Sequence, residues 1–167
     1  MSSAQLMEND ISLDADTDQY LTFMLAGEEY GVDILRVQEI KGWDSVTPIP
    51  NTPQYIKGVI NLRGTIVPIF DLRERFGLEP IPYGPTTVVI VLKVMREGES
   101  RTMGVVVDAV SEVYNIKEEE LKASPDFGAS VSTEFVQGLA TIEETMIIVL
   151  DIDFLLNSSV ADELELS

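Results

Sequence analysis

The side chain best placed for binding chemistry in this sequence is Arg63, in the short polar segment Asn61-Leu62-Arg63-Gly64. Apolar, β-branched runs at Val59–Ile60 and Thr65–Phe70 flank this segment, a pattern that predicts a tight hairpin with a strand on each side. A surface turn requires residues such as Asn and Gly, but it does not require an arginine. A guanidinium held on a short turn is suited to binding a carboxylate, whereas the simpler interpretation is a solvated turn charge.

The composition excludes most catalytic chemistry. The chain has no histidine and no cysteine, so it cannot form a Ser-His-Asp or Cys-His nucleophile, an imidazole base, a zinc site of the Cys/His type or a disulfide. No glycine-rich nucleotide-binding motif is present. Without disulfides or a basic-then-apolar leader, the chain is expected in a reducing cytoplasm. Its longest apolar runs, such as Thr86–Val94, are too short for direct membrane insertion.

The carboxylates offer weaker candidates for chemistry. The segment 14–18 begins like a calcium loop, but the sixth position is Gln19 and the twelfth is Leu25, where Gly and Glu are needed. Asp151 and Asp153 are the most suggestive acid–base pair, yet at a strand-to-helix junction N-capping is the simpler role. No residue pattern in the sequence therefore points to a catalytic site, a metal site or a cofactor, but this absence alone does not exclude a catalyst.

Charge and length limit the classes of partner. The 167 residues carry a net charge of −18, from 29 acidic and 11 basic residues, and 45% hydrophobic content is enough for one domain with a real core. An acidic, base-free N-terminal segment 1–18 and an acidic segment 158–167 are predicted to be solvated tails, disordered at the N-terminus, around a domain at 19–157. Such an excess of negative charge disfavours nucleic acid and anionic lipid as partners.

The domain between the tails consists mainly of predicted strands. The pattern predicts strands at Tyr20–Leu25 and Tyr30–Asp33, followed by a short helical turn that leads into a strand over Ile34–Ile40. It then predicts a short helix from Pro53 to Gly58 and another over Leu72–Phe76, with Gly77 as the C-cap of the second. Another short helix is predicted around Glu118–Glu120. The proline-rich segment around Gly84 cannot be regular structure, so it is the best internal boundary.

Beyond this boundary the pattern repeats loosely and in order. The matching pairs are YLTFML with TVVIVL, VQEI with VSEV, and TIVPIFDL with TMIIVLDI, starting at residues 20 and 87, 37 and 110, and 65 and 145. Chance similarity between β-rich segments is an alternative, but the shared order favours two related β subdomains, divided near 77–86. With about five short strands each, small closed barrels are the expected way to remove sheet edges. Pro68 inside a strand fits an edge or a bulge.

At this point the sequence resembles a known family. The segments EEYGVDILRVQEI (28–40), NTPQYIKGVINLRGTIVPIFDLR (51–73), TVVIVL (87–92) and GVVVDAVSEV (104–113) are similar to the CheW-like family of bacterial chemotaxis coupling proteins. The resemblance covers about residues 19–157, and turn and cap residues match in order as well as the hydrophobic pattern. It implies a mainly β fold of two intertwined, SH3-like, five-stranded β barrels that share a hydrophobic core, with a few short helices.

The resemblance also implies a function and a set of site residues. Members of this family are non-enzymatic adaptors that join the cytoplasmic tips of transmembrane chemoreceptors to the regulatory domain of the histidine kinase CheA in a chemosensory array. The positions that match the family's receptor groove are Val37, Glu39, Arg63, Val88, Gly104 and Val113. The positions that match its kinase contacts are Gly58, Lys122 and Phe127, where Lys122 stands in place of an arginine and would weaken a bidentate contact.

Each of these residues also has a structural interpretation. The valines are equally well explained by core packing, and Glu39 by an intramolecular ion pair with Arg63, which is compatible with binding because a pre-paired arginine can orient a surface. Gly58 and Gly104 are expected to let another backbone approach closely. Phe127 lies in a loop-like segment, where an aromatic either anchors the loop or fills a partner's pocket.

Two other functions remain open at the level of sequence. A CheW-like scaffold of another chemosensory pathway, such as pilus motility, has the same biochemistry. A small acidic β-barrel enzyme or carbohydrate-handling domain belongs to a different class. Capture of a kinase and receptors from a lysate would favour an adaptor of either pathway over the enzyme. The expected location is the cytoplasm, with recruitment to membrane-anchored receptor arrays.

Overall fold

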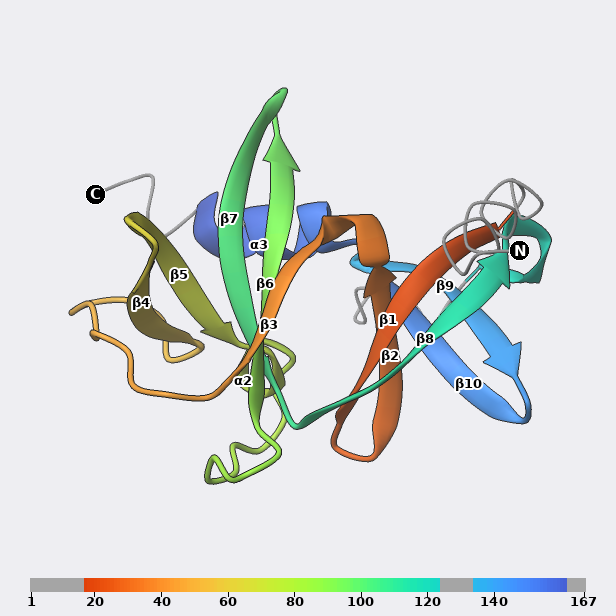
Figure 1. Cartoon of the computed structure of the whole chain (residues 1–167), viewed down its shortest axis with the longest axis horizontal. Coiled ribbons are helices and arrows are strands. Elements are labelled where there is room, and N and C mark those ends of the chain that lie inside the picture. Colours follow the sequence, from red (N-terminus) through yellow and green to blue (C-terminus); the bar gives the residue numbers. More distant parts are fainter. Residues whose placement is uncertain (1–16, 124–133, 162–167) are drawn as a thin grey trace, which may run out of the picture.

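Ten strands form two five-stranded sheets that lie side by side in the computed structural model, which describes residues 17–123 and 134–161 (Figure 1). The elements are β1 (Thr17–Leu25), β2 (Glu28–Asp33), η1 (Ile34–Arg36), β3 (Val37–Gly42), β4 (Ile56–Leu62), β5 (Thr65–Asp71), α2 (Leu72–Arg75), β6 (Val88–Arg96), β7 (Glu99–Val107), β8 (Ala109–Lys117), η2 (Glu118–Glu120), β9 (Val136–Ile142), β10 (Thr145–Leu150) and α3 (Ile152–Ala161).

The two sheets have the same topology, which confirms the predicted duplication. Sheet A has the order β8-β1-β2-β10-β9 and sheet B has the order β3-β6-β7-β5-β4. Each position of one sheet is occupied in the other by the strand whose number differs by five. The pairing also matches, because β2–β10 and β7–β5 are parallel while the remaining pairs are antiparallel. Asp71 and Asp151 are equivalent as predicted, since Asp71 is the last residue of β5, Asp151 directly follows β10, and each caps the following helix.

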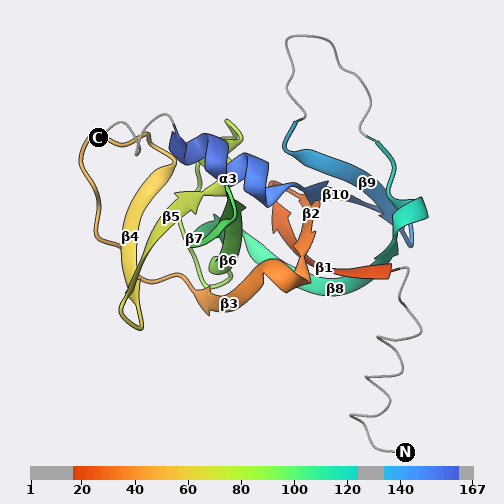
Figure 2. The ribbon, with the colours of Figure 1, turned by 90° about the horizontal axis from the view of Figure 1, so that it is seen from above.

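The strands are exchanged between the two halves of the chain. The chain leaves sheet A at η1 and returns to it at Asp108, so β1 and β2 form a sheet with the strands of the second half. The segment 77–86 separates the two strand repeats but joins β5 to β6 within sheet B. Helix α3 follows β10 of sheet A and lies beside the strands of sheet B (Figure 2). It includes residues 158–161, which were expected in the C-terminal tail.

Three apolar clusters explain why the sheets stay together. Each barrel has a small interior of its own, Tyr20, Ile116, Ala140, Ile147 and Val149 in sheet A and Val67, Ile69, Val89, Val91 and Val106 in sheet B. A larger shared core lies between them and takes side chains from β1, β2, β4, β5, α2, β6, β7, β10 and α3. On β6, Ile90 and Leu92 face this shared core while Val89 and Val91 face the interior of sheet B. Burial on both faces accounts for the unbroken apolar run of β6.

One ion pair fixes each of the two crossovers between the sheets, and the basic and acidic partners change places between the two pairs. At η1, Arg36 donates two hydrogen bonds of 2.8 Å to Asp153 of α3. At the return crossover the acid is on the crossover instead, where Asp108 accepts from Arg73 of α2 at 2.8 and 3.0 Å. Asp153 also accepts a backbone N–H from β6, and Asp108 also accepts one from the β1–β2 turn. Bidentate pairs of this kind hold a crossover and a helix in one relative orientation.

The local structure differs from expectation in the segment before β4. The predicted short helix from Pro53 to Gly58 is wrong, because β4 begins at Ile56 and Gly58 lies within it, next to a β-bulge. Pro68 lies on β5, which is an internal strand, but β7 pairs only with Ile69–Asp71. The missing N–H of Pro68 therefore falls outside the part of β5 that is paired with β7.

A candidate partner-binding face

Arg63 and Glu39 form an ion pair on sheet B. Arg63 and Gly64 form the two-residue turn between β4 and β5, with φ of 51° and 90°, and Asn61 Oδ1 accepts the Gly64 N–H at 2.8 Å. This geometry is that of a type I′ hairpin, whose twist matches that of the strands. Arg63 Nη2 lies 2.7 Å from Glu39 Oε1. Since β3 and β4 are the outer strands of sheet B, the pair joins its two open edges.

The arginine remains available despite this pair. Its side chain is 73% exposed, whereas that of Glu39 is 26% exposed. A guanidinium has five N–H donors, and one of these bonds to Glu39, so the others face solvent. The intramolecular pair therefore holds the arginine in one orientation without covering it.

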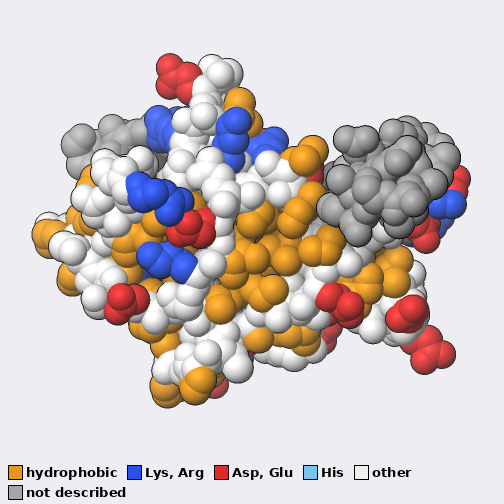
Figure 3. All heavy atoms as spheres, viewed as in Figure 1, with side chains coloured by type: hydrophobic (Ala, Val, Ile, Leu, Met, Phe, Trp, Pro, Cys, Tyr) orange, Lys and Arg blue, Asp and Glu red, His pale blue; other side chains and the backbone are white. Residues whose placement is uncertain are grey.

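Apolar side chains line the region between the two sheets. Val37 on β3 and Val88 on β6 are half-buried and pack against the shared core, whereas Val113 on β8 is 45% exposed. Ile40 on β3, at the position equivalent to Val113, is 42% exposed. Figure 3 shows hydrophobic side chains gathered in the middle of this face, between the two halves of the molecule. The core-packing interpretation therefore holds for Val37 and Val88 but not for Val113.

Gly58 and Gly104 have close neighbours within the chain. At Gly58 φ is +144°, and a Cβ would lie 2.2 Å from the carbonyl oxygen of Thr47. At Gly104 a Cβ would lie 2.7 Å from Ile69 Cδ1 and 3.0 Å from Val89 Cγ1, in the interior of sheet B. The backbone that approaches Gly58 belongs to this chain, and side chains rather than a backbone surround Gly104.

Lys122 closes the edge of sheet A. Its backbone N–H and C=O bond to Leu139 of β9 at 2.8 and 2.7 Å, which matches the bridge between Thr47 and Val59 in sheet B. The side chain of Lys122 is exposed. Phe127, the third residue expected to contact a kinase, lies outside the described residues.

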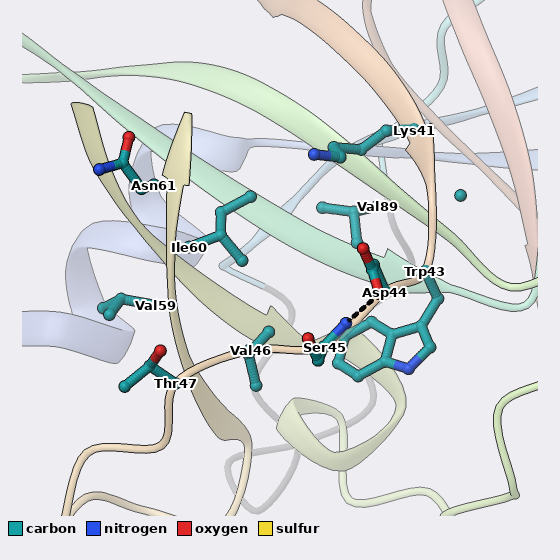
Figure 4. Close-up of a pocket in the computed structure, with 11 residues that line it drawn as sticks. Lys41, Trp43, Asp44, Ser45, Val46, Thr47, Val59, Ile60, Asn61 and Val89 are labelled. Atoms are coloured by element: carbon teal, nitrogen blue, oxygen red, sulfur yellow. Dashed lines mark hydrogen bonds between the residues drawn. The ribbon is translucent and has the colours of Figure 1, made fainter. Parts of the chain in front are cut away.

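A hollow beside the edge of sheet B was not expected from the sequence. It has a volume of about 250 Å³ and lies between the segment after β3 and strand β4 (Figure 4). Trp43 lies at its rim and packs on Tyr83, with ring centroids 4.4 Å apart. Tyr83 Oη in turn donates a 2.5 Å hydrogen bond to Asp71, and burial together with this bond raises the pKa of Tyr83. The only available signal was that Trp43 is the single tryptophan of the chain.

The carboxylates considered for chemistry have structural roles. Asp151 Oδ1 accepts the backbone N–H of Phe154 at 3.1 Å, so the predicted N-cap is confirmed, and Asp153 is held by Arg36. Within residues 17–123 and 134–161, no cluster of three or more acidic side chains is arranged to hold a metal ion. In the same part of the chain, no helix is long and apolar enough to cross a membrane.

Comparison with known proteins finds relatives of this chain in both sequence and structure. The sequence profile of the CheW-like domain matches residues 19–160. Chemotaxis protein CheW of Klebsiella aerogenes is 49% identical over 140 residues, which are 84% of this chain and 82% of that protein. Chemotaxis protein CheW of Rhizobium meliloti is 35% identical over 135 residues, 81% of this chain and 84% of the relative. The crystal structure of the scaffolding protein TtCheW from Thermoanaerobacter tengcongensis has a TM-score of 0.73 at 37% identity and covers 83% of this chain and 92% of its own.

Proposed function

Because the chain belongs to the CheW-like domain family, we propose that it couples chemoreceptors to a CheA-type histidine kinase. It is a non-enzymatic adaptor of bacterial chemotaxis signalling. Its partners are the cytoplasmic tips of receptors and the regulatory domain of the kinase, and its place of action is the cytoplasmic side of receptor arrays. The observation that carries this proposal is an oriented, exposed arginine on the same molecule as an exposed apolar strip between two rigid barrels.

The receptor surface combines this arginine with the apolar positions between the sheets. A helical receptor tip would bury apolar area on Val113 and on the exposed edges of Val37 and Val88, while Arg63 would fix its orientation through an acidic side chain. Glu39 acts by holding Arg63 in place. Gly104 supports this surface from below, because it lets β7 pack closely on Val89.

The kinase surface is assigned to Gly58, Lys122 and Phe127. Gly58 and Lys122 both lie where a barrel closes, at equivalent edges of sheets B and A. A partner with the same double-barrel fold would meet these edges with its own. Lys122 contributes an exposed charge, whereas Gly58 contributes through the shape of the β4 edge.

Replacement of Arg63 by alanine tests the receptor surface. The arginine of the pair is largely solvent-exposed, so its loss should change the free energy of unfolding by less than about 1 kcal/mol. Co-sedimentation with receptor-containing membranes should fall at least several-fold, while the circular dichroism spectrum stays native. Arg101→Ala, at an exposed arginine on β7, is the matched control and should bind receptor normally. A large fall in melting temperature without a specific binding loss would make Arg63 a structural residue only.

A further inference from the structure

We call the barrels formed by sheets A and B barrel A and barrel B. The duplication gives barrel A a hairpin equivalent to the one that carries Arg63 in barrel B. Glu143 and Glu144 form the β9–β10 turn with φ of 49° and 71°, the same left-handed pair as Arg63 and Gly64 at 51° and 90°. The flanking pairs also agree, because Ile142 pairs with Thr145 as Leu62 pairs with Thr65. Glu143 therefore occupies the position of Arg63 in barrel A.

The acid that Arg63 binds also has a counterpart in barrel A. Glu112 on β8 follows the shared V-x-E pattern, and its backbone bonds with Thr22 Oγ1 opposite it on β1 at 2.8 and 3.2 Å. Glu39 lies opposite Val91 on β6 in the same way, next to a register shift in both cases. Barrel A thus has two glutamates where barrel B has an arginine–glutamate pair. The ion pairs Arg36–Asp153, Lys57–Glu74, Arg63–Glu39 and Arg73–Asp108 do not include Glu112 or Glu143.

A third carboxylate faces the same end of barrel A. Glu29 on β2 is only 7% exposed, and its Oε2 atom is buried without a hydrogen-bond partner. Tyr114 lies near all three carboxylates: its hydroxyl donates a 2.7 Å bond to Glu112 Oε1, and the charges of Glu29 and Glu143 also act on it. This bond, desolvation and the negative charges of Glu29, Glu112 and Glu143 raise the pKa of Tyr114 to about 12. A buried carboxylate oxygen without a partner is costly unless a cation or donor reaches it.

The charge distribution of the two sheets makes sheet A the more acidic one. The strands of sheet A carry one basic residue, Lys117, and five acidic ones, Asp18, Glu28, Glu29, Asp33 and Glu112. Those of sheet B carry five basic residues, Lys41, Lys57, Lys93, Arg96 and Arg101, and three acidic ones, Glu39, Asp71 and Glu99. In Figure 3 acidic side chains lie over the region of the β9–β10 hairpin.

We propose that Glu29, Glu112, Glu143 and Tyr114, the barrel A acidic site, receive an arginine side chain from a protein partner. The incoming guanidinium would take the place that Arg63 occupies in barrel B, with Tyr114 providing an aromatic face and the glutamates providing acceptors. A metal ion is disfavoured, because the acidic groups of the described residues do not converge on a metal position. A second copy of this chain is disfavoured by its net charge of −18.

Arginine is favoured over lysine for a geometric reason. The three acceptors lie on separate strands and a hairpin, and the planar guanidinium presents five donors in a fixed arrangement, whereas an ammonium presents three on one atom. Guanidinium is also more weakly hydrated, which suits an acceptor as buried as Glu29. This site uses none of the residues of the proposed receptor surface, although Glu112 and Tyr114 flank Val113 on β8, so the two proposals are tested on different residues.

The first test supplies the missing cation within the chain. Glu143→Arg should rebuild the Arg63–Glu39 arrangement in barrel A and raise the melting temperature by about 1–4 °C, as expected for one partly exposed pair. Glu144→Arg, one residue away in the same turn, is the matched control and should raise it less. Equal effects of the two variants, or a lower melting temperature for folded Glu143→Arg, would overturn the proposal.

The second test measures binding of the side-chain chemistry itself. N-acetyl-L-arginine amide is titrated into the isotopically labelled full chain, followed by backbone amide NMR, beside N-acetyl-L-lysine amide and sodium chloride at equal ionic strength. Shifts should concentrate at Glu29, Glu112 and Tyr114, with an apparent Kd at least three-fold lower for the arginine compound. Glu112→Gln should weaken binding several-fold, whereas Glu99→Gln on β7 should not.

Either of two outcomes of this titration would overturn the proposal. One is equal shifts with the arginine compound, the lysine compound and salt, which would show a general charge effect. The other is unchanged binding in Glu112→Gln and in Glu143→Arg. If Glu143→Arg does not fold, Glu143→Gln replaces it and should weaken binding in the same direction.

Discussion

Replacement of Gly58 by alanine should strongly destabilise barrel B. Gly58 has φ of +144°, a region that is nearly restricted to glycine and costs other residues about 1–3 kcal/mol. The added Cβ would also lie 2.2 Å from the carbonyl oxygen of Thr47, so that the backbone must move. Movement of Thr47 would break its two 2.9 Å hydrogen bonds with Val59, each worth about 1 kcal/mol.

These contributions sum to about 3–5 kcal/mol, a large part of the about 5–15 kcal/mol that stabilises an ordinary domain. For a chain of this size, the melting temperature should fall by about 6–20 °C. Gly98→Ala is the matched control, because Gly98 also has a positive φ of +82° but has open space around its Cβ position. It should cost only about 1–2 kcal/mol.

Thermal unfolding followed by circular dichroism measures both variants, and binding to the kinase regulatory domain is measured well below the lower melting temperature. If Gly58→Ala melts within about 3 °C of Gly98→Ala, the close approach of Thr47 does not constrain the fold as described. Weak kinase binding by the folded Gly58→Ala protein would show that the shape of the β4 edge contributes to that interface.

Three further predictions concern other parts of the molecule. Arg36→Ala should destabilise the protein by about 1–3 kcal/mol in urea titrations. The double variant Arg36→Asp with Asp153→Arg should recover part of this loss, because the second crossover already has the acid on the crossover and the arginine on the helix. Because the pKa of Tyr114 is raised from 10.0 to about 12, its contribution to stability is complete below pH 10 and is lost as the pH rises toward 12. Between pH 10 and pH 12 the free energy of unfolding of Tyr114→Phe should therefore decrease less than that of the unmodified protein. Lys122→Ala should weaken kinase binding without changing receptor binding, whereas Lys117→Ala, at an exposed lysine of the same sheet, should change neither.

The sequence predicted the elements whose signals are local. The β4–β5 hairpin, the turn at η1 and the helix over Leu72–Arg75 were all foreseen, because glycine, asparagine and capping residues act on their immediate neighbours. The segment from Pro53 to Gly58 was assigned to a helix because Pro and Gly often mark helix ends. Here Gly58 serves a strand, since it lies next to a β-bulge against β5 and lets Thr47 approach β4 closely, a contact that sequence spacing does not show.

The sequence by itself determined the family, the repeat and the classes of chemistry that the chain lacks. These follow from residue types and their order, which are the same in any conformation. Only the tertiary structure decided which strand pairs with which, because the exchange of β1 and β2 into sheet A depends on contacts between residues far apart in the chain. Only the structure showed that Arg63 has an acidic partner while Glu143, at the equivalent turn, has no ion pair with a basic residue in the part of the chain that the structure describes, because each pairing depends on which strand lies across the barrel.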